Sequence, residues 1–265
     1  MECLMRWGVV IAAGGSAPPD LAARLGVPNK ALAPILGKTS LEWILHELGS
    51  WPVERRVVVG PESLRRLVGS WEWVAESGSA IDNVLAGVEA LGPQVEAVLM
   101  LPSDAPLLTR SGTEHFVQSV EARCVGGDGP GERWFAAGLA SATQFRQQYP
   151  QLECIPLRLR GEPLLAGGLY AASPAGLRHA VSILQVMRHS RKSQLKMALR
   201  LGLGPCLRYF MRRITLVEAE QIVGRFFGGP TILVSDCEPE SVIDFDSADE
   251  FDRVLETCVR RGLSG

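Results

Sequence analysis

Residues 8–16 read Gly-Val-Val-Ile-Ala-Ala-Gly-Gly-Ser, a short apolar run that stops at two glycines. Such a run is typical of a strand buried on both faces, as in a parallel sheet. Ligands of open α/β sheets bind at the carboxyl ends of the strands, and glycines let backbone N–H groups approach a phosphate. The stretch therefore predicts a buried strand followed by a phosphate-binding loop at Ala13, Gly14, Gly15 and Ser16, although a strand-ending turn would also explain the glycines.

Strand-like and helix-like segments alternate along the next hundred residues. Strands are predicted at 56–60, 73–75 and 96–101, and helices at 40–48, 61–68 and 79–91. Ser40 is predicted to cap the helix at 40–48, and Ile81, Val84, Leu85 and Val88 are predicted to face inward from the helix at 79–91. The short links between them predict a parallel, doubly wound sheet with right-handed crossovers. Later segments are less regular, with irregular strands at 134–141 and 156–170, a strand at 231–235 and a closing helix at 247–261. We expect one domain over residues 1–265, with a helical, basic insert at about 177–228.

The composition narrows the class of protein. The chain has 265 residues, of which 46% are hydrophobic, and its formal net charge is −2, so it carries no nucleic-acid signature. Its six cysteines form neither a CxxC pair nor a zinc-like pattern with histidine, which is typical of reduced thiols. The apolar run at 7–13 is too short for a signal peptide or a membrane span. We therefore expect a cytoplasmic protein without a transmembrane segment.

Two basic residues follow the glycines. Lys30 can neutralise phosphate charge as a compact cation, and Arg24 can do so with a fork of donors. Each by itself is more typical of a solvated surface charge. The apolar stretch at 31–35 directly behind Lys30 favours a position at a buried edge.

Acidic residues follow two of the predicted strands. Asp104 comes just after the strand at 96–101, and Asp244 and Asp246 follow the late strand. Mg²⁺ takes oxygen ligands, usually one or two carboxylates plus substrate phosphates. Asp104 would supply one carboxylate, and Asp246 or Asp244 the other. The alternatives are a turn cap at Asp104 and an acidic helix N-terminus at the late pair.

In this order, the segments resemble the MobA-like nucleotidyltransferases, the superfamily that includes molybdenum cofactor guanylyltransferase and cytidylyltransferases. The matching stretches cover nearly the whole chain and lie at 9–15, 24–30, 37–44, 101–107 and 243–251. The resemblance implies an α/β fold with a Rossmann-like, mostly parallel sheet flanked by helices (GT-A-like), Mg²⁺ as cofactor, and an inserted helical lobe. It also implies attack by a phosphate or phosphonate oxygen on the α-phosphate of an NTP, with release of pyrophosphate.

The resemblance also implies roles for single residues. By motif position, Ala13, Gly14, Gly15 and Ser16 would bind the nucleotide, Lys30, Arg24 and Asp104 would be catalytic, and Asp104 and Asp246 would hold the metal. The stretch at 76–87 is similar to the base-reading segment of cytidylyltransferases, which adds Gly78 and Asn83 to the predicted nucleotide site. Asn83 can donate to and accept from a base edge, or cap its own turn.

The chain departs from the family pattern in its glycine loop. Arg24 comes nine residues after Gly15, whereas the family has an arginine four or five residues on. Pro18 and Pro19 between them have no N–H to donate. Either the loop bulges, or phosphate contact ends at Ser16 and Ala17.

The acceptor side is defined least by sequence. Gly167, Gly168 and Lys192 are predicted to contact the acceptor. The insert is rich in basic residues, at positions 188, 191, 192, 196, 200, 208, 212, 213 and 225. This excess favours an anionic partner, either a phosphorylated acceptor or an acidic lipid surface, but a solvated helix face explains it equally well.

The expected partners are an NTP and a small phosphorylated acceptor, with no nucleic acid, and a homodimer is left open. Two other hypotheses compete. A metal-dependent glycosyltransferase would need an Asp-x-Asp at 103–105, where only Asp104 is acidic. A non-catalytic nucleotide-binding relative is compatible with the lengthened loop, because a fold does not determine a function.

Overall fold

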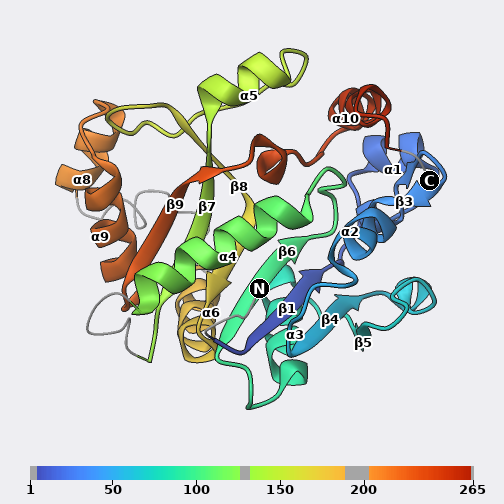
Figure 1. The fold of residues 1–265 in the computed structure, drawn as a ribbon, viewed down its shortest axis with the longest axis horizontal. Helices are drawn as coiled ribbons and strands as arrows, with labels where there is room; N and C mark the ends of the chain where they lie inside the picture. The colour runs from blue at the N-terminus through green and yellow to red at the C-terminus, as the bar shows by residue number, and fades with distance from the viewer. Residues whose placement is uncertain (1–4, 126–131, 189–202, 264–265) are drawn as a thin grey trace.

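A seven-stranded sheet forms the centre of the molecule (Figure 1). The computed structural model describes residues 5–125, 132–188 and 203–263. The strands have the order β5-β4-β1-β6-β8-β7-β9. Their bounds are β1 Trp7–Ala12, β4 Arg55–Gly60, β5 Glu72–Ala75, β6 Ala97–Pro102, β7 Phe135–Ser141, β8 Leu164–Ala172 and β9 Thr231–Cys237. β8 runs antiparallel to β6 and β7, and the other neighbouring pairs are parallel, which confirms the predicted mostly parallel α/β sheet.

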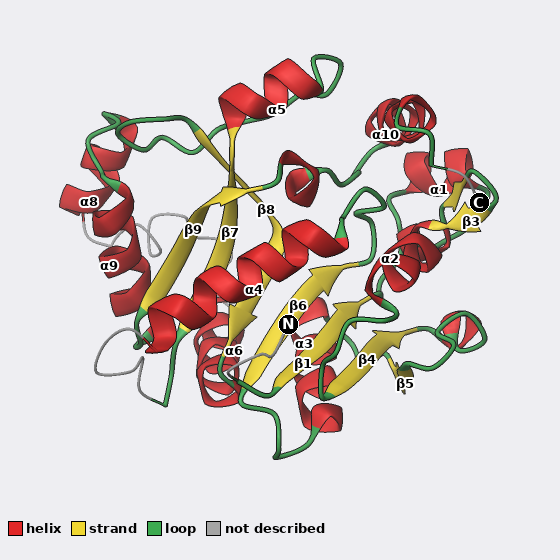
Figure 2. Cartoon of the chain, viewed as in Figure 1, coloured by secondary structure: helices red, strands yellow, loops and turns green. Residues whose placement is uncertain are grey.

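Helices cover both faces of the sheet (Figure 2). The α-helices are α1 Pro19–Leu25, α2 Ser40–Leu48, α3 Ala80–Leu91, α4 Arg110–Val125, α5 Ala142–Gln148, α6 Pro174–Arg188, α8 Leu203–Phe210, α9 Leu216–Phe227 and α10 Ala248–Arg260. The short elements are η1 Lys30–Leu32, η2 Glu62–Leu64, η3 Pro239–Val242 and the hairpin of β2 Pro34–Ile35 with β3 Lys38–Thr39. α4 crosses the front of the sheet in Figure 1, and α3 and α6 lie behind it.

β1 is buried on both faces, as its apolar sequence predicts. Val9 and Ile11 pack into the core beneath α2 and α4, whereas Val10 packs into the core beneath α3. The opposite directions follow from the two-residue period of a strand. β1 is also hydrogen-bonded to β4 on one side and β6 on the other. The loop after β1 therefore starts from a rigid, central position.

Several predicted helices differ in detail from the observed ones. The segment predicted as a helix at 61–68 forms only the short η2. In α3, the sequence suggested that Ile81 and Val84 point into the core, but both are only partly buried and line a cavity. The residues of α3 that pack fully against the sheet are Val88 and Leu91. Among the described residues, no helix is both long and apolar enough to cross a bilayer.

The N-terminus of α2 is capped by a different residue from the one that the sequence suggested. Ser40 was the predicted cap, but Thr39 takes that place: its hydroxyl accepts from the Glu42 N–H at 3.2 Å, and the Glu42 carboxylate accepts from the Thr39 N–H at 2.7 Å. The Ser40 hydroxyl instead donates to the backbone oxygen of Ser103 at 2.9 Å. α2 is thereby tied to the loop after β6.

We expect Thr39→Ala to lower the free energy of unfolding by about 1 kcal/mol, because the cap and its reciprocal bond to Glu42 are lost. Urea denaturation measures this change as a lower midpoint with an unchanged slope. Thr39→Ser retains the hydroxyl and is the matched control. Equal stability of the alanine variant and the wild type would contradict this capping role.

Candidate functional site

The loop after β1 is held by one buried side chain, Asn29. Its amide donates to the backbone oxygens of Ala13 at 2.8 Å and Gly15 at 2.9 Å, and its side-chain oxygen accepts from the Ala31 N–H at 2.7 Å. The Ala13 N–H in turn donates to Val59 in β4 at 2.8 Å. Asn29 therefore joins the glycine loop to the start of η1, which is where Lys30 lies. This role was not predicted from the sequence, although Asn is a residue that commonly caps a helix.

The two glycines are required for different reasons. A Cβ atom on Gly14 would collide with the Asn83 amide and lie 2.7 Å from a carboxylate oxygen of Glu76. Gly15 has a φ of 91°, in the left-handed region that side chains disfavour. Its N–H donates to Glu76 Oε2 at 2.8 Å. The Glu76 carboxylate thus accepts a hydrogen bond from one of the N–H groups predicted to bind phosphate. Ser16, the next residue, is exposed.

Asn83 lies beneath this loop and is buried, with 3% of its surface exposed. Its side-chain oxygen accepts from the Ser77 N–H at 2.7 Å, which anchors the turn that precedes α3. Gly78 lies in that turn with a φ of 72°. Both residues therefore stand beside the glycine loop, and one of the two hydrogen-bonding groups of Asn83 is already used. Contact with a base remains a prediction.

Lys30, Asp104 and Asp246 form the charged centre of the site. The Lys30 ammonium donates to Asp104 Oδ2 at 2.7 Å and also to Asp246 Oδ1. Burial by itself would lower the pKa of Lys30, but Asp104 and then Asp246 outweigh burial, so the pKa is raised above its ordinary value. Lys30 is therefore a cation at any physiological pH. Of the two acidic residues proposed as partners for Asp104, Asp246 is the one that shares Lys30 with it.

Asp244 lies next to this centre, at the edge of a cavity. Although water can reach Asp244, desolvation by its surroundings, followed by repulsion from Asp104 and Asp246, raises its pKa to about 6. Burial, followed by the charge of Asp244, also raises the pKa of Tyr170. Tyr170 therefore stays protonated and presents a hydroxyl group beside this acid.

The segment between the glycines and Lys30 does not bulge as a loop. Pro18 caps α1 and Pro19 occupies its first turn, where proline needs no N–H partner. Arg24 lies in the last turn of α1, pairs with Asp252 of α10 at 2.5 Å and stacks 5.5 Å from the centre of the Phe251 ring. Arg24 therefore lies at the contact between α1 and α10, and its catalytic role remains a prediction.

Most of the described part of the insert 177–228 belongs to α6, α8 and α9, and a non-helical segment at 211–215 joins α8 to α9. The charged residues of the insert form two ion pairs among those described: Arg208 with Glu218 at 2.5 Å, and Glu220 with Arg123 of α4 at 2.6 Å. The predicted acceptor residue Lys192 lies outside the described residues.

Gly167 and Gly168 line a cavity of about 1010 Å³ on the face of the sheet that α3 and α6 cover. A Cβ atom on Gly167 would lie only 2.5 Å from the backbone oxygen of Ser241. The glycine is needed there because η3 crosses β8 closely. Both glycines line this cavity, but packing already explains Gly167, and acceptor contact remains a prediction.

The glycine loop depends on Asn29 for its shape, so we expect Asn29→Ala to lower the free energy of unfolding by about 1–3 kcal/mol. The substitution leaves the buried Ala13 oxygen without its partner. Asn29→Asp retains the acceptor for Ala31 but not the donors, so it separates the two parts of the effect. Chemical denaturation measures both variants, and a loss below about 0.5 kcal/mol in Asn29→Ala would rule out this role.

Comparison with known protein families and solved structures agrees with the fold described above. The MobA-like NTP transferase domain matches residues 8–194, and curated protein sequences gave no match. A hypothetical transferase from Thermus thermophilus superposes with a TM-score of 0.78 at 23% identity, covering 93% of this chain and 99% of that one. A nucleotidyl transferase from Methanothermobacter thermautotrophicus gives 0.57 at 16% identity, covering 97% and 99%.

A 4-diphosphocytidyl-2C-methyl-D-erythritol synthase from Anaerococcus prevotii superposes with a TM-score of 0.52 at 12% identity, covering 96% of this chain and 99% of that one. At these identities the solved structures establish a shared fold. The family match covers most of the chain and agrees with the resemblance that the motifs predict. This chain belongs to the MobA-like NTP transferase domain family.

Proposed function

We propose that this protein transfers a nucleoside monophosphate from an NTP to a phosphorylated acceptor and releases pyrophosphate, with Mg²⁺ as cofactor. The observation that carries the proposal is the meeting of Lys30, Asp104 and Asp246 beside the glycine loop, at the carboxyl ends of β1 and β6. Phosphoryl-type transfer depends on positioning and charge neutralisation more than on a covalent nucleophile. This set of side chains supplies those two functions.

In the proposed step, an oxygen of the acceptor phosphate attacks the α-phosphorus of the NTP and forms a new P–O bond. The bond from the α-phosphorus to the oxygen that bridges to the β-phosphate breaks, and its electron pair leaves with pyrophosphate. Lys30 would stabilise negative charge on the triphosphate, since its long side chain can turn from the carboxylates to a phosphate. The loop that Asn29 holds would position the triphosphate.

The carboxylates fit a magnesium ion. One oxygen each from Asp104 and Asp246 contacts the same ammonium group, so both converge on one position that a cation already occupies. Across the described residues, no three His, Cys, Asp or Glu side chains gather as a complete metal site. This matches Mg²⁺, which is commonly held by one or two carboxylates and completed by substrate phosphates and water. Bound there, the metal would neutralise charge on the phosphates.

The proposal is tested by melting the full chain with each of the four NTPs, with and without Mg²⁺. An NTP that binds only the folded state must raise the melting temperature, and we expect a rise that needs Mg²⁺. Asp104→Asn should abolish the Mg²⁺-dependent part and lower pyrophosphate release by about 100-fold or more.

Asp236→Asn is the matched control, because Asp236 is an exposed aspartate that pairs with His115 of α4, away from the loop. It should behave as the wild type. A protein that melts cooperatively but responds to no NTP would refute the proposal. Binding without pyrophosphate release from any phosphorylated acceptor would favour the non-catalytic alternative.

Glu76 gives a second test, because its carboxylate accepts from the Gly15 N–H that a phosphate would use. Two anions cannot share this donor without repulsion, so Glu76, which is exposed, would turn away when an NTP binds. We expect Glu76→Gln to bind the NTP as tightly as the wild type or more tightly, measured by titration calorimetry. A tenfold weaker affinity would show instead that Glu76 contacts the nucleotide favourably.

A further inference from the structure

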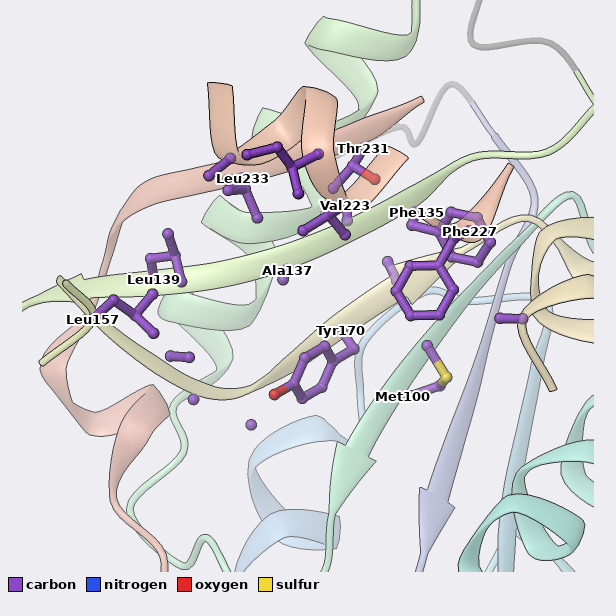
Figure 3. A pocket seen from close by; sticks show the side chains of 18 of the residues that line it. Met100, Phe135, Ala137, Leu139, Leu157, Tyr170, Val223, Phe227, Thr231 and Leu233 are labelled. Carbon is purple, nitrogen blue, oxygen red and sulfur yellow. The ribbon is translucent and has the colours of Figure 1, made fainter. Parts of the chain in front are cut away.

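The cavity beside the charged centre is long and predominantly apolar (Figure 3). Its volume of about 1010 Å³ is at the upper end of the range for small-molecule sites. Met100 and Phe135 line it from the sheet, and Phe227 faces them from α9. Leu139 and Leu157 lie at a greater distance from Met100 along the same wall in Figure 3. A ligand of this cavity must therefore present mainly apolar surface.

One wall of the cavity is a helix whose apolar side is left incompletely covered. α9 contains no fully buried residue, although Ala219, Ile222, Val223 and Phe227 all point to the cavity. An amphipathic helix normally buries its apolar stripe against the core. The exposed side chains of Leu207, Phe210, Met211 and Val217 lie in or next to α8 and α9, and Phe210 also lines the cavity. This wall therefore presents apolar side chains that an apolar ligand could cover.

The cavity reaches the proposed site of chemistry at one end. Ala12, Pro102 and Asp244 belong to its lining, and they lie within two residues of Ala13, Asp104 and Asp246 in the chain. The other end reaches Leu233 in β9. β1 and β9 are separated by four strand spacings, or about 19 Å at about 4.8 Å for each spacing. The cavity thus extends from the charged centre across the sheet.

The nucleotide does not account for the far part of this cavity. In the proposed function, the nucleotide lies at the glycine loop and the turn before α3, beside β1 and β4. The far part of the cavity is lined by residues of β7, β9 and the segments packed on them, namely Leu139, Leu159, Ile214 and Leu233. These strands lie on the opposite side of β6 from β1 and β4. This part lies on the side where a second substrate would approach, next to Gly167 and Gly168.

We propose that the acceptor is an amphiphile: a phosphate monoester whose phosphate lies beside Lys30, at the Mg²⁺ that Asp104 and Asp246 would hold, and whose apolar alkyl or isoprenoid-like chain lies in the cavity. The inference rests on the proposed function for its phosphate end. It adds the class of substrate, because a small polar acceptor such as a sugar phosphate would leave the apolar walls in contact with water. Each methylene that enters the cavity adds favourable burial of apolar surface.

The test is a chain-length series on the full protein. Titration calorimetry in the presence of Mg²⁺ with butyl, hexyl, octyl and decyl phosphate, each below its micelle concentration, should give a dissociation constant that falls by up to about fourfold for each added methylene. Decyltrimethylammonium has the same chain and the opposite charge, and should bind at least tenfold more weakly than decyl phosphate. Equal affinity for butyl and decyl phosphate would overturn the inference, as would equal binding of the two decyl compounds.

Two substitutions should block the cavity without touching the charged centre. Ala137→Phe places a ring on the sheet floor and Val223→Trp enlarges the opposing wall on α9. Both should remove the dependence of the dissociation constant on chain length. Ala122→Phe is the control, because Ala122 is exposed on α4 at the other face of the sheet, and it should retain the full dependence. A dependence that persists in both blocked variants would also overturn the inference.

The same preparations separate this inference from the proposed function. A melting shift with NTP and Mg²⁺, combined with no effect of chain length, overturns the amphiphile and leaves the transferase standing. A clear effect of chain length with no response to any NTP supports the apolar site and overturns the transferase. When both responses are seen, pyrophosphate release with the alkyl phosphates should show a KM that falls along the series, and a KM independent of chain length would count against the assignment.

Discussion

The ammonium group of Lys30 joins three parts of the chain that are far apart in sequence. Asp104 is 74 residues away and Asp246 is 216 residues away, yet both carboxylates contact this one nitrogen. Lys30 and Asp104 are largely withdrawn from water, with about a fifth and a seventh of their side chains exposed. Such charges are tolerated away from water only when they are paired. The C-terminal segment must therefore return to the edge formed by β1 and β6.

The order of the strands places a polar region and an apolar cavity next to each other along the sheet. β1 and β4 carry the glycine loop and its partners, whereas β8, β7 and β9 carry the apolar floor of the cavity. β6 lies between the two groups and ends next to Asp104. Because η3 crosses β8 at Gly167, it also brings Asp244 to the junction of the two regions. The charged centre is thus placed where a nucleotide and an acceptor would meet.

Much of the first half of the molecule could be predicted from local patterns. β1, α2, α3 and β6 lie within a residue or so of their predicted bounds, because apolar runs and capping residues act locally. Asp104 and Asp246 were predicted to be site carboxylates because both follow strands in the sequence. Side-chain partners could not be predicted in this way. Arg24 is engaged by Asp252 and Phe251, and the Gly15 N–H by Glu76, which are residues distant in sequence.

The sequence by itself determined the class of fold, the family and the residue types of the charged centre, since each depends on composition, order and spacing. Only the tertiary structure decided that Asp246 rather than Asp244 shares Lys30 with Asp104, that Asn29 holds the loop, and that an apolar cavity adjoins the site. The physical reason is that hydrogen bonds, ion pairs and cavity walls depend on distances in space. In this chain those distances are set by the packing of β8, η3 and α9 around the sheet, which no local pattern records.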